Sequence, residues 1–261
     1  MSKRNIEGSR AIVTGASSGI GREIVRELAR HGAAVVAVAR REERLVELAG
    51  ETRADGGRIE IVPGDITDAA VRGRALEAAV SSFGGLDTLV NNAGIGATGL
   101  FENAAEERLR RIFEVNFFAI VEMTRAALPL LREGTSPIVV NVSSVFGHRG
   151  VPHNSEYCAS KFALRGFSEA IRSELSRDKI DVLVVSPGTT ETEFVDSVLE
   201  KTSSPAWPEH APATAAEVAR ATVRAIRRGR REIIPYGWGK LFCWLNRLSP
   251  GLVDRMMVRY V

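Results

Sequence analysis

The sequence predicts an α/β fold in which a doubly wound parallel sheet of about seven strands carries helices on both faces. Apolar, β-branched runs recur along the chain, and amphipathic stretches long enough for helices separate them. Strands that alternate with such helices pair in parallel through right-handed crossovers. No internal repeat, low-complexity tract or interdomain linker interrupts this order, so residues 1–261 are expected to form a single domain.

The strands are predicted from short runs of buried character. Parallel strands are covered on both faces, so they are apolar at nearly every position instead of alternating. The predicted strands are Ala11–Val13, Ala34–Ala39, Ile59–Val62, Thr88–Val90, Ile138–Val142, Val182–Val185 and Glu232–Ile234.

The helices are predicted from apolar positions that recur every three or four residues, which places them on one side of a helix. The clearest stretches are Arg22–Arg30, Glu42–Ala54, Ala69–Phe83 and Ala215–Arg228. Residues 189–212 are different, because Pro205, Pro208 and Pro212 break any long helix. We predict a substrate loop over this stretch, since a long loop in a compact domain is usually functional.

Composition narrows the classes of function. The chain has 261 residues, of which 44% are hydrophobic and 26% charged, and its net charge of +3 comes from interspersed signs that do not favour nucleic acid. Two cysteines and four histidines without ligand spacing predict neither a disulfide framework nor a metal site. The polar start and the lack of a long apolar run favour a cytoplasmic protein.

A glycine turn follows the first predicted strand and opens the first helix. Glycines suit this place because side chains would block the sharp turn and hold the backbone away from a pyrophosphate, which binds at the helix N-terminal amides. The alternative is a tight turn whose glycines serve packing only. The expected phosphate-binding residues are Gly15, Ser17, Ser18, Gly19, Ile20 and Gly21, within Thr14-Gly15-Ala16-Ser17-Ser18-Gly19-Ile20-Gly21.

Four further motifs follow in order along the chain. Asn91-Asn92-Ala93-Gly94 ends the fourth strand, Asn116 lies in a helical stretch, Ser143-Ser144 follows the fifth strand, and Tyr157 precedes Lys161 by one helical turn. Together with the TGxxxGIG turn, they resemble the short-chain dehydrogenase/reductase family from about Arg10 to Thr192, and more loosely to about Ile234. The resemblance implies a Rossmann-like single domain and a catalytic tetrad of Asn116, Ser144, Tyr157 and Lys161.

The tetrad's residue types suit proton transfer to or from a substrate oxygen. A phenol with an ordinary pKa of about 10 is a poor base at neutral pH, so the Lys161 ammonium is expected to lower the pKa of Tyr157. Tyr157 then acts as general acid or base, and Ser144 stabilises charge on the substrate oxygen. By resemblance, Asn116 holds a water in a proton relay. Taken singly, these residues are also explained as turn caps, a buried polar group or a surface pair.

The resemblance also implies cofactor contacts in three other segments. Asn92, Ala93 and Gly94 belong to one of them, and Asp65-Ile66 after the third strand resembles the pair that contacts adenine, whereas Asp68 is predicted as a helix N-cap. Pro187-Gly188 and the residues after it resemble the PGxxxT segment, in which Thr190 and Thr192 would hold the carboxamide. Thr190 departs from the valine or isoleucine that is common there.

The end of the second strand predicts NADP(H) in preference to NAD(H). An NAD-preferring protein usually places an acidic side chain there for the ribose 2′-hydroxyl, but this chain has Ala39-Arg40-Arg41. Arg40 is expected to pair with a 2′-phosphate, supported by Ser17 or Arg41. For Arg41 the alternative, a solvated helix start beside Glu42 and Glu43, remains open.

The C-terminal tail, about residues 235–261, is aromatic and basic. Trp238, Phe242 and Trp244 beside Lys240 and Arg247 would suit a membrane surface, but we favour a wall of the substrate pocket or a subunit contact. With Phe194 and Trp207 of the loop, the tail favours a hydrophobic substrate. By resemblance, a homo-oligomer forms through the helices that carry Asn116 and Tyr157.

The sequence therefore predicts an oxidoreductase that transfers a hydride between NADP(H) and a carbonyl or alcohol group of a hydrophobic small molecule. A non-catalytic dinucleotide sensor is the first alternative, but it would normally lack the tyrosine or the lysine. A membrane-peripheral protein that acts through its tail is the second.

Overall fold

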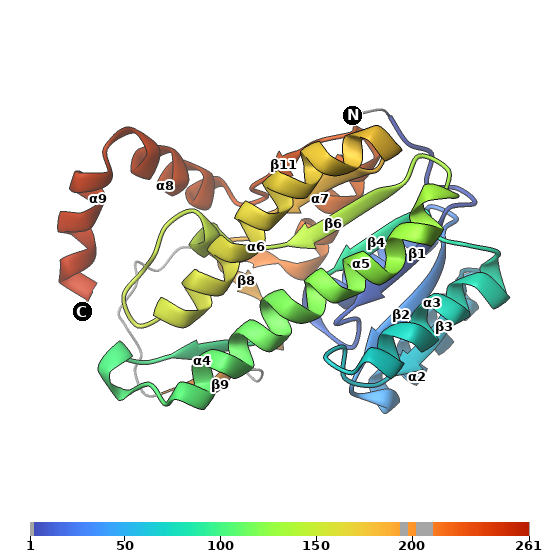
Figure 1. Ribbon diagram of the computed structural model, residues 1–261, viewed down its shortest axis with the longest axis horizontal. Helices are drawn as coiled ribbons and strands as arrows, with labels where there is room; N and C mark the ends of the chain where they lie inside the picture. The colour runs from blue at the N-terminus through green and yellow to red at the C-terminus, as the bar shows by residue number, and fades with distance from the viewer. Residues whose placement is uncertain (1–2, 194–197, 202–210, 261) are drawn as a thin grey trace.

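The computed structural model describes residues 3–193, 198–201 and 211–260, which build a seven-stranded parallel sheet between two layers of helices (Figure 1). The strand order is β11-β7-β6-β4-β1-β2-β3. Chain order reverses beside β1, where β2 and β4 are its neighbours, and this switch point opens a crevice at the carboxyl ends of the strands. The strands are β1 (Arg10–Thr14), β2 (Ala34–Ala39), β3 (Arg58–Pro63), β4 (Thr88–Asn91), β6 (Ile138–Val142), β7 (Asp181–Val185) and β11 (Glu232–Ile233).

Successive residues of a strand pack into opposite helical layers. Val13 of β1 belongs to the core cluster formed with the helices of one layer, whereas Ile12 beside it belongs to the cluster formed with the helices of the other layer. All six residues of β2 are buried. Burial on both faces explains why the strands are apolar throughout.

The helices and short turns follow the strands in regular alternation. The helices are α1 (Gly19–Arg30), α2 (Glu42–Ala54), α3 (Ala69–Phe83), α4 (Glu106–Phe113), α5 (Ala119–Arg132), α6 (Ser155–Glu174), α7 (Ala215–Arg227), α8 (Gly237–Leu248) and α9 (Pro250–Met257). A π-helical turn, Glu114–Phe118, joins α4 to α5. In the described part of the chain, 3₁₀ turns cover Phe101–Asn103, Val145–Gly147, Leu175–Asp178 and Val258–Tyr260.

The predicted strands and helices are confirmed, and their ends differ by at most three residues. The largest difference is at α1, which begins at Gly19 instead of Arg22. The amide of Arg22 already donates to the carbonyl of Ser18, so the helix starts inside the glycine turn. Asp68 caps α3 as predicted, because its carboxylate accepts a hydrogen bond of 2.8 Å from the amide of Ala70.

The predicted substrate loop carries short strands in its described part, which corrects the expectation of an irregular loop. β8 (Thr190–Glu191) pairs with β10 (Ala213–Thr214), and β9 (Val198–Lys201) pairs with β5 (Gly96–Thr98). These pairings satisfy backbone groups that a loop would leave to solvent. Phe194, Pro205, Trp207 and Pro208, which the sequence analysis singled out, lie outside the described residues.

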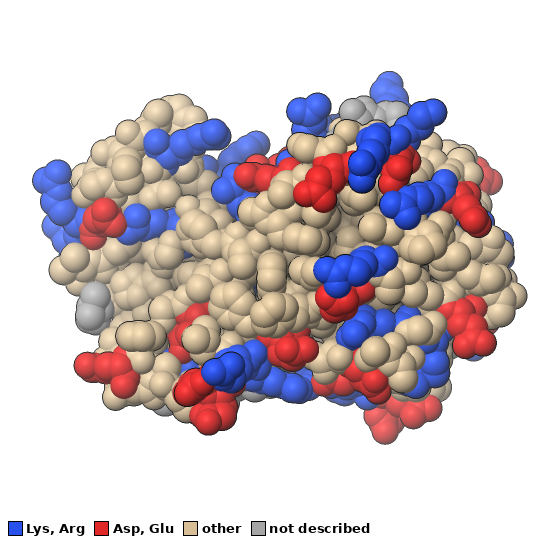
Figure 2. Space-filling model, viewed as in Figure 1, with Lys and Arg blue, Asp and Glu red and all other residues tan. Residues whose placement is uncertain are grey.

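Charged side chains of both signs are intermingled over the body of the molecule (Figure 2). Among the described helices, none has the length and apolar character needed to cross a membrane. Within the same residues, no group of three or more His, Cys, Asp or Glu side chains could hold a metal ion.

Candidate active site

A cavity of about 760 Å³ lies at the carboxyl ends of the central strands. Its lining comes from the segments that follow β1, β2, β3, β4, β6 and β7, together with the first two turns of α6. Because parallel strands end at the same edge of the sheet, residues far apart in the chain meet there. The volume falls in the range of small-molecule and cofactor sites.

The glycine turn between β1 and α1 leaves no room for side chains. A Cβ on Gly15 would lie 2.8 Å from Ala93 Cα, and one on Gly21 would lie 2.2 Å from the Gly15 carbonyl oxygen. Gly15 and Gly19 also have positive φ angles, of 68° and 53°, which favour glycine. The turn therefore keeps the amino end of α1 close to the cavity, where helix amides can bind an anion.

Asn92 and Thr14 fasten the glycine turn to the next strand of the sheet. The Asn92 amide group donates to the carbonyls of Thr14 at 3.0 Å and Gly15 at 3.2 Å. The Thr14 hydroxyl accepts from the amides of Asn92 and Ala93 at 3.0 and 3.1 Å. Asn92 thus supports the turn that would hold the cofactor.

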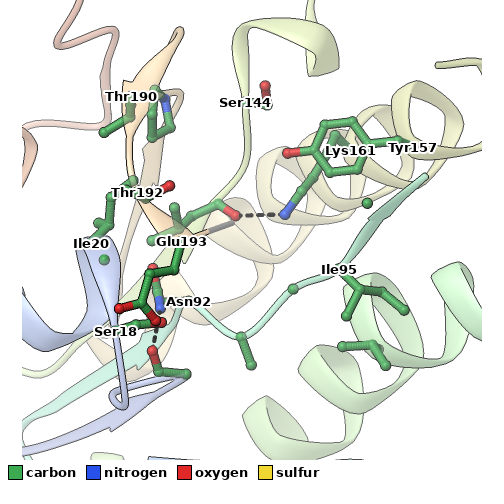
Figure 3. A pocket seen from close by; sticks show the side chains of 18 of the residues that line it. Ser18, Ile20, Asn92, Ile95, Ser144, Tyr157, Lys161, Thr190, Thr192 and Glu193 are labelled. Carbon is green, nitrogen blue, oxygen red and sulfur yellow. Dashed lines mark hydrogen bonds between the residues drawn. The ribbon is translucent and has the colours of Figure 1, made fainter. Parts of the chain in front are cut away.

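Ser144, Tyr157 and Lys161 meet at one side of the cavity (Figure 3). Ser144 caps the 3₁₀ turn after β6, and its hydroxyl accepts from the amide of Phe146 at 3.1 Å. Tyr157 and Lys161 lie one turn apart on α6, with the Lys161 ammonium 5.6 Å from the centre of the Tyr157 ring. Ser143, which precedes it and also lines the cavity, donates to the carbonyl of Lys161 at 3.2 Å.

Burial governs the protonation of this pair. It raises the pKa of Tyr157 well above its ordinary value, and a hydrogen bond with Ser144 opposes the shift only in part. The direction of this shift is opposite to the predicted lowering of the Tyr157 pKa by Lys161. In the structure burial outweighs such an effect, and the same burial lowers the pKa of Lys161 to about 8. The Lys161 ammonium donates to the carbonyl of Val142 at 3.0 Å.

Asn116 lies behind the cavity lining, in the π-helical turn between α4 and α5. Its side-chain oxygen accepts from the amide of Ile95 at 2.9 Å, and its nitrogen donates to the carbonyl of Ile95 at 2.9 Å and to Ser160 at 3.1 Å. A Cβ on Gly94 would lie 3.3 Å from the Asn116 oxygen and 3.5 Å from the Lys161 ammonium. Asn116 and Lys161 therefore flank the same glycine.

Most of the predicted site residues line this one cavity. Gly21 and Asn116 are the exceptions, because each lies one layer behind it. The lining members are Gly15, Ser17, Ser18, Gly19, Ile20, Arg40, Asp65, Ile66, Asn92, Ala93, Gly94, Ser144, Tyr157, Lys161, Pro187, Gly188, Thr190 and Thr192.

Both arginines after β2 reach the cavity. The Arg41 guanidinium donates to the hydroxyl of Ser17 at 3.2 Å and to that of Ser18 at 2.5 Å, beside the glycine turn. It also forms an ion pair of 3.0 Å with Glu193. Arg40 is exposed. Burial pushes the pKa of Asp65 upward, but hydrogen bonds from Thr67 and then the charges of Arg111 and Arg40 outweigh it, so that pKa lies below its usual value.

The segment after β7 closes the cavity from the other side. Thr192 packs on the glycine turn, since a Cβ on Gly19 would lie 3.1 Å from its side chain. Thr190 donates from its hydroxyl to the carbonyl of Gly188 at 3.0 Å. Behind Gly188 lies Tyr236, whose ring is 2.1 Å from the place a Cβ would take. The glycine therefore admits the tyrosine that leads into α8.

Sequence reasoning missed several residues of the site. Glu193 lines the cavity and pairs with Arg41, and no motif marked it. Ile95, Val115 and Phe146 also line it, and the Phe146 ring packs edge-to-face on Tyr157 with centroids 6.3 Å apart. Only their nearness to NNAG, Asn116 and Ser144 in the sequence could have indicated them.

The fold and the site define a dinucleotide-binding oxidoreductase, and comparison with known proteins identifies its family. Residues 9–203 match the short chain dehydrogenase family model, so the chain belongs to the short-chain dehydrogenase/reductase family. It is 33% identical to the ketoacyl reductase HetN of Nostoc over 264 residues, covering 96% of this chain and 88% of that protein.

Two solved structures show the same architecture. A short-chain dehydrogenase/reductase of Burkholderia phymatum in complex with NAD has a TM-score of 0.87 at 24% identity, covering 95% of this chain and 96% of that one. An alcohol dehydrogenase of Thermococcus sibiricus complexed with 5-hydroxy-NADP has a TM-score of 0.77 at 26% identity, covering 87% and 95%. The chain is thus an oxidoreductase of a family that acts on CH–OH and C=O groups.

Proposed function

We propose that the protein is an NADP(H)-dependent reductase of apolar carbonyl compounds, with Tyr157 as the general acid. The observation that carries this proposal is the meeting of Ser144, Tyr157 and Lys161 beside a glycine turn that lacks room for side chains. The proposed proton donor, the glycine turn for the cofactor and the apolar wall all line one cavity.

Tyr157 is protonated at neutral pH, because burial raises its pKa, and the protonated phenol is the form that acts as a general acid. A phenol that keeps its proton at neutral pH can donate it to a substrate oxygen as that oxygen gains negative charge. Ser144, bonded to the same phenol, would donate a second hydrogen bond to that oxygen. When bound, the cofactor supplies the hydride that goes to the carbonyl carbon.

Lys161 and Asn116 support the proton donor from behind. The Lys161 ammonium would hold the nicotinamide ribose hydroxyls while its neighbour Tyr157 transfers the proton. Asn116 flanks the same glycine as Lys161, which suits a bound water that returns a proton to the pair. Lys161 and Asn116 would thus position Tyr157 and return its proton after each transfer.

The arginines after β2 support a preference for NADP(H). Position 39 is alanine and position 40 arginine, so no carboxylate meets a ribose 2′-hydroxyl there. Arg40 would pair with the 2′-phosphate, and Arg41 would support it from the hydroxyls of Ser17 and Ser18. The 5-hydroxy-NADP complex of the Thermococcus enzyme agrees with this proposal, whereas the Burkholderia protein holds NAD.

The cavity wall supports an apolar substrate. Ile95, Val115, Val145 and Phe146 line the side on which Tyr157 lies. HetN is named a ketoacyl reductase, and a ketoacyl group carries a ketone on an acyl chain. A ketone or aldehyde with an acyl-like body would therefore fit the wall and reach Ser144.

Turnover of apolar ketones and aldehydes by the purified chain tests the reaction. We expect Tyr157→Phe to keep NADPH binding, measured by fluorescence, while turnover falls by roughly 10²–10⁴-fold because the transferable proton is gone. Tyr260→Phe is the matched control and should retain turnover. Full turnover by Tyr157→Phe would remove it from the mechanism.

Fluorescence titration with NADPH and NADH tests the cofactor preference. Arg40→Ala should weaken NADPH binding about tenfold or more, as expected for the loss of a charge-assisted hydrogen bond, and leave NADH binding unchanged. Arg41→Ala should weaken NADPH binding in the same direction. Arg44→Ala is the control, because Arg44 is exposed beside them but does not line the cavity. Equal losses for both cofactors would refute the phosphate contact.

A further inference from the structure

The last two helices, α8 and α9, have an inner face that packs on the body of the protein. Val253 and Met257 are buried in a cluster with Val151 and Cys158, the latter on α6. Cys243 on the inner side of α8 is buried as well. The packing of the inner face thus holds α8 and α9 on the body of the protein, and their outer face is available for a different contact.

The outer face of these helices is apolar and exposed. Trp244 and Leu248 are 62% and 63% exposed, and large apolar side chains continue beside them. Such neighbours on one surface differ from scattered apolar residues, which are common and need no explanation. We call this surface the outer strip: Trp238, Leu241, Trp244, Leu248, Leu252 and Met256.

Basic side chains border the outer strip. Lys240, Arg247, Arg255 and Arg259 are exposed in this region, and the single acid, Asp254, is paired with Arg149 of the body. In Figure 2 the lobe over α8 and α9 shows uncharged surface and basic side chains with little acid, unlike the mixed charges elsewhere. Its charge is complementary to an anionic surface.

We infer that the outer strip docks on an anionic lipid membrane, with α8 lying in the interface. Tryptophan and leucine on one face beside lysine and arginine are the residue types that bind at the boundary of headgroups and acyl chains. A second copy of the chain is the less suitable occupant. A two-fold contact would place the strip on itself and bring its cations together without acids to balance them.

Docking would also place the cavity beside the membrane. Gly239 of α8 packs on Val145, and Tyr236 before the helix packs on Gly188, both of which line the cavity. Insofar as the proposed reduction of apolar carbonyls holds, a substrate dissolved in lipid could then enter without crossing water. This last step rests on the proposed function, whereas the docking does not.

Co-sedimentation of the full chain with vesicles tests the docking. We expect binding to vesicles rich in phosphatidylglycerol, a blue shift of tryptophan fluorescence, and little binding to pure phosphatidylcholine. Lys240→Glu with Arg247→Glu should weaken binding at least about tenfold, since each basic residue near an anionic surface contributes about 1 kcal/mol. Arg227→Glu with Arg228→Glu makes the same charge change on the body and should have no such effect.

A second pair of variants tests the apolar contact. Trp244→Gln with Leu248→Gln should abolish binding, whereas Val46→Gln with Val80→Gln, exposed apolar residues of α2 and α3, should preserve it. NADPH titration of every variant checks the fold and the cofactor site separately, so a failure of docking is distinct from a failure of the proposed enzyme. Absence of binding to phosphatidylglycerol vesicles would overturn the inference. It would also be overturned if Trp244→Gln with Leu248→Gln changed the oligomeric mass but left vesicle binding unchanged.

Discussion

Lys161 is buried as a cation in the proposed active site, and this has an energetic cost. Its ammonium has one backbone acceptor, the carbonyl of Val142, and burial lowers its pKa to about 8. An unfolded lysine titrates near 10.4, so the folded state binds the proton less tightly by about 3 kcal/mol. Function and stability therefore make opposite demands on this position.

We predict that Lys161→Met stabilises the protein near neutral pH while it removes turnover. Below about pH 8 both states of the wild type carry the proton, and folding includes the full cost of burying the charge. Between about pH 8 and pH 10.4 only the unfolded state keeps it, so the free energy of unfolding of the wild type rises with pH. The advantage of Lys161→Met, up to about 3 kcal/mol near pH 7, should disappear by about pH 10.

Urea denaturation at about pH 7 and about pH 10 measures the difference in the free energy of unfolding between Lys161→Met and the wild type. Lys179→Met is the matched control, since Lys179 is exposed and should change stability little at either pH. A constant difference between Lys161→Met and the wild type across this range would contradict the assignment of a buried ammonium.

The helices that carry the site are held together by a buried ion pair between α4 and α6. The Arg108 guanidinium donates to the Glu156 carboxylate at 2.6 and 2.9 Å, and both side chains are 3% exposed. Burial pushes the pKa of Glu156 upward, but hydrogen bonds from Ser155 and Arg108 outweigh it, so that pKa lies below its usual value. Glu156 immediately precedes Tyr157, which links the pair to the proposed proton donor.

We predict that Arg108→Met destabilises the protein by about 3–5 kcal/mol, because it leaves the Glu156 carboxylate buried without its partner. Urea denaturation should show the loss, and the double variant Arg108→Met with Glu156→Met should recover most of it. The matched surface pair is Arg110 with Glu106, where Arg110→Met should cost less than about 1 kcal/mol. An equally small cost at Arg108 would show that the pair does not hold α4 on α6.

Sequence alone predicted the seven strands of the main sheet and four of the helices, because their signal is local periodicity. It also predicted which residues meet at the cavity, since the glycine turn, NNAG, Ser144 and the Tyr157–Lys161 pair each follow a strand or lie on one helix face. It did not predict the direction of the Tyr157 pKa, because burial at a residue is set by segments far away in the chain. For the same reason it left open whether Arg41 belongs to the site or to a solvated helix start, and it missed Glu193.

The C-terminal tail also shows that local sequence does not determine which side chains are buried. Its composition indicated apolar and basic character, and two interpretations were favoured over a membrane surface. Which side of α8 is exposed depends on the packing of Cys243, Val253 and Met257 against the body. Only that packing separates an inner face from the outer strip.

At the scale of the whole molecule, a second exposed apolar surface accompanies the outer strip. It lies on the helices that the family resemblance assigns to subunit contacts. Phe118 and Phe162 are 50% and 42% exposed at the start of α5 and on α6. The Phe117 ring packs on Phe118 and on Phe167 of α6, which joins the two regions. These helices lie toward the viewer in Figure 1, and in Figure 2 the middle of the surface over them is uncharged, with charged side chains of both signs over the C-terminal half of α6 and beside α5.

We predict that the protein is a dimer or tetramer in solution and that Phe118→Glu with Phe162→Glu shifts it toward monomers, since carboxylates in a subunit contact would be buried without partners. Light scattering during gel filtration measures the mass. Val46→Glu with Val80→Glu, on exposed apolar positions of α2 and α3, should leave the mass unchanged. If both double variants keep the wild-type mass, the contact lies elsewhere; if only the outer strip variants change it, α8 and not α5 and α6 forms the contact.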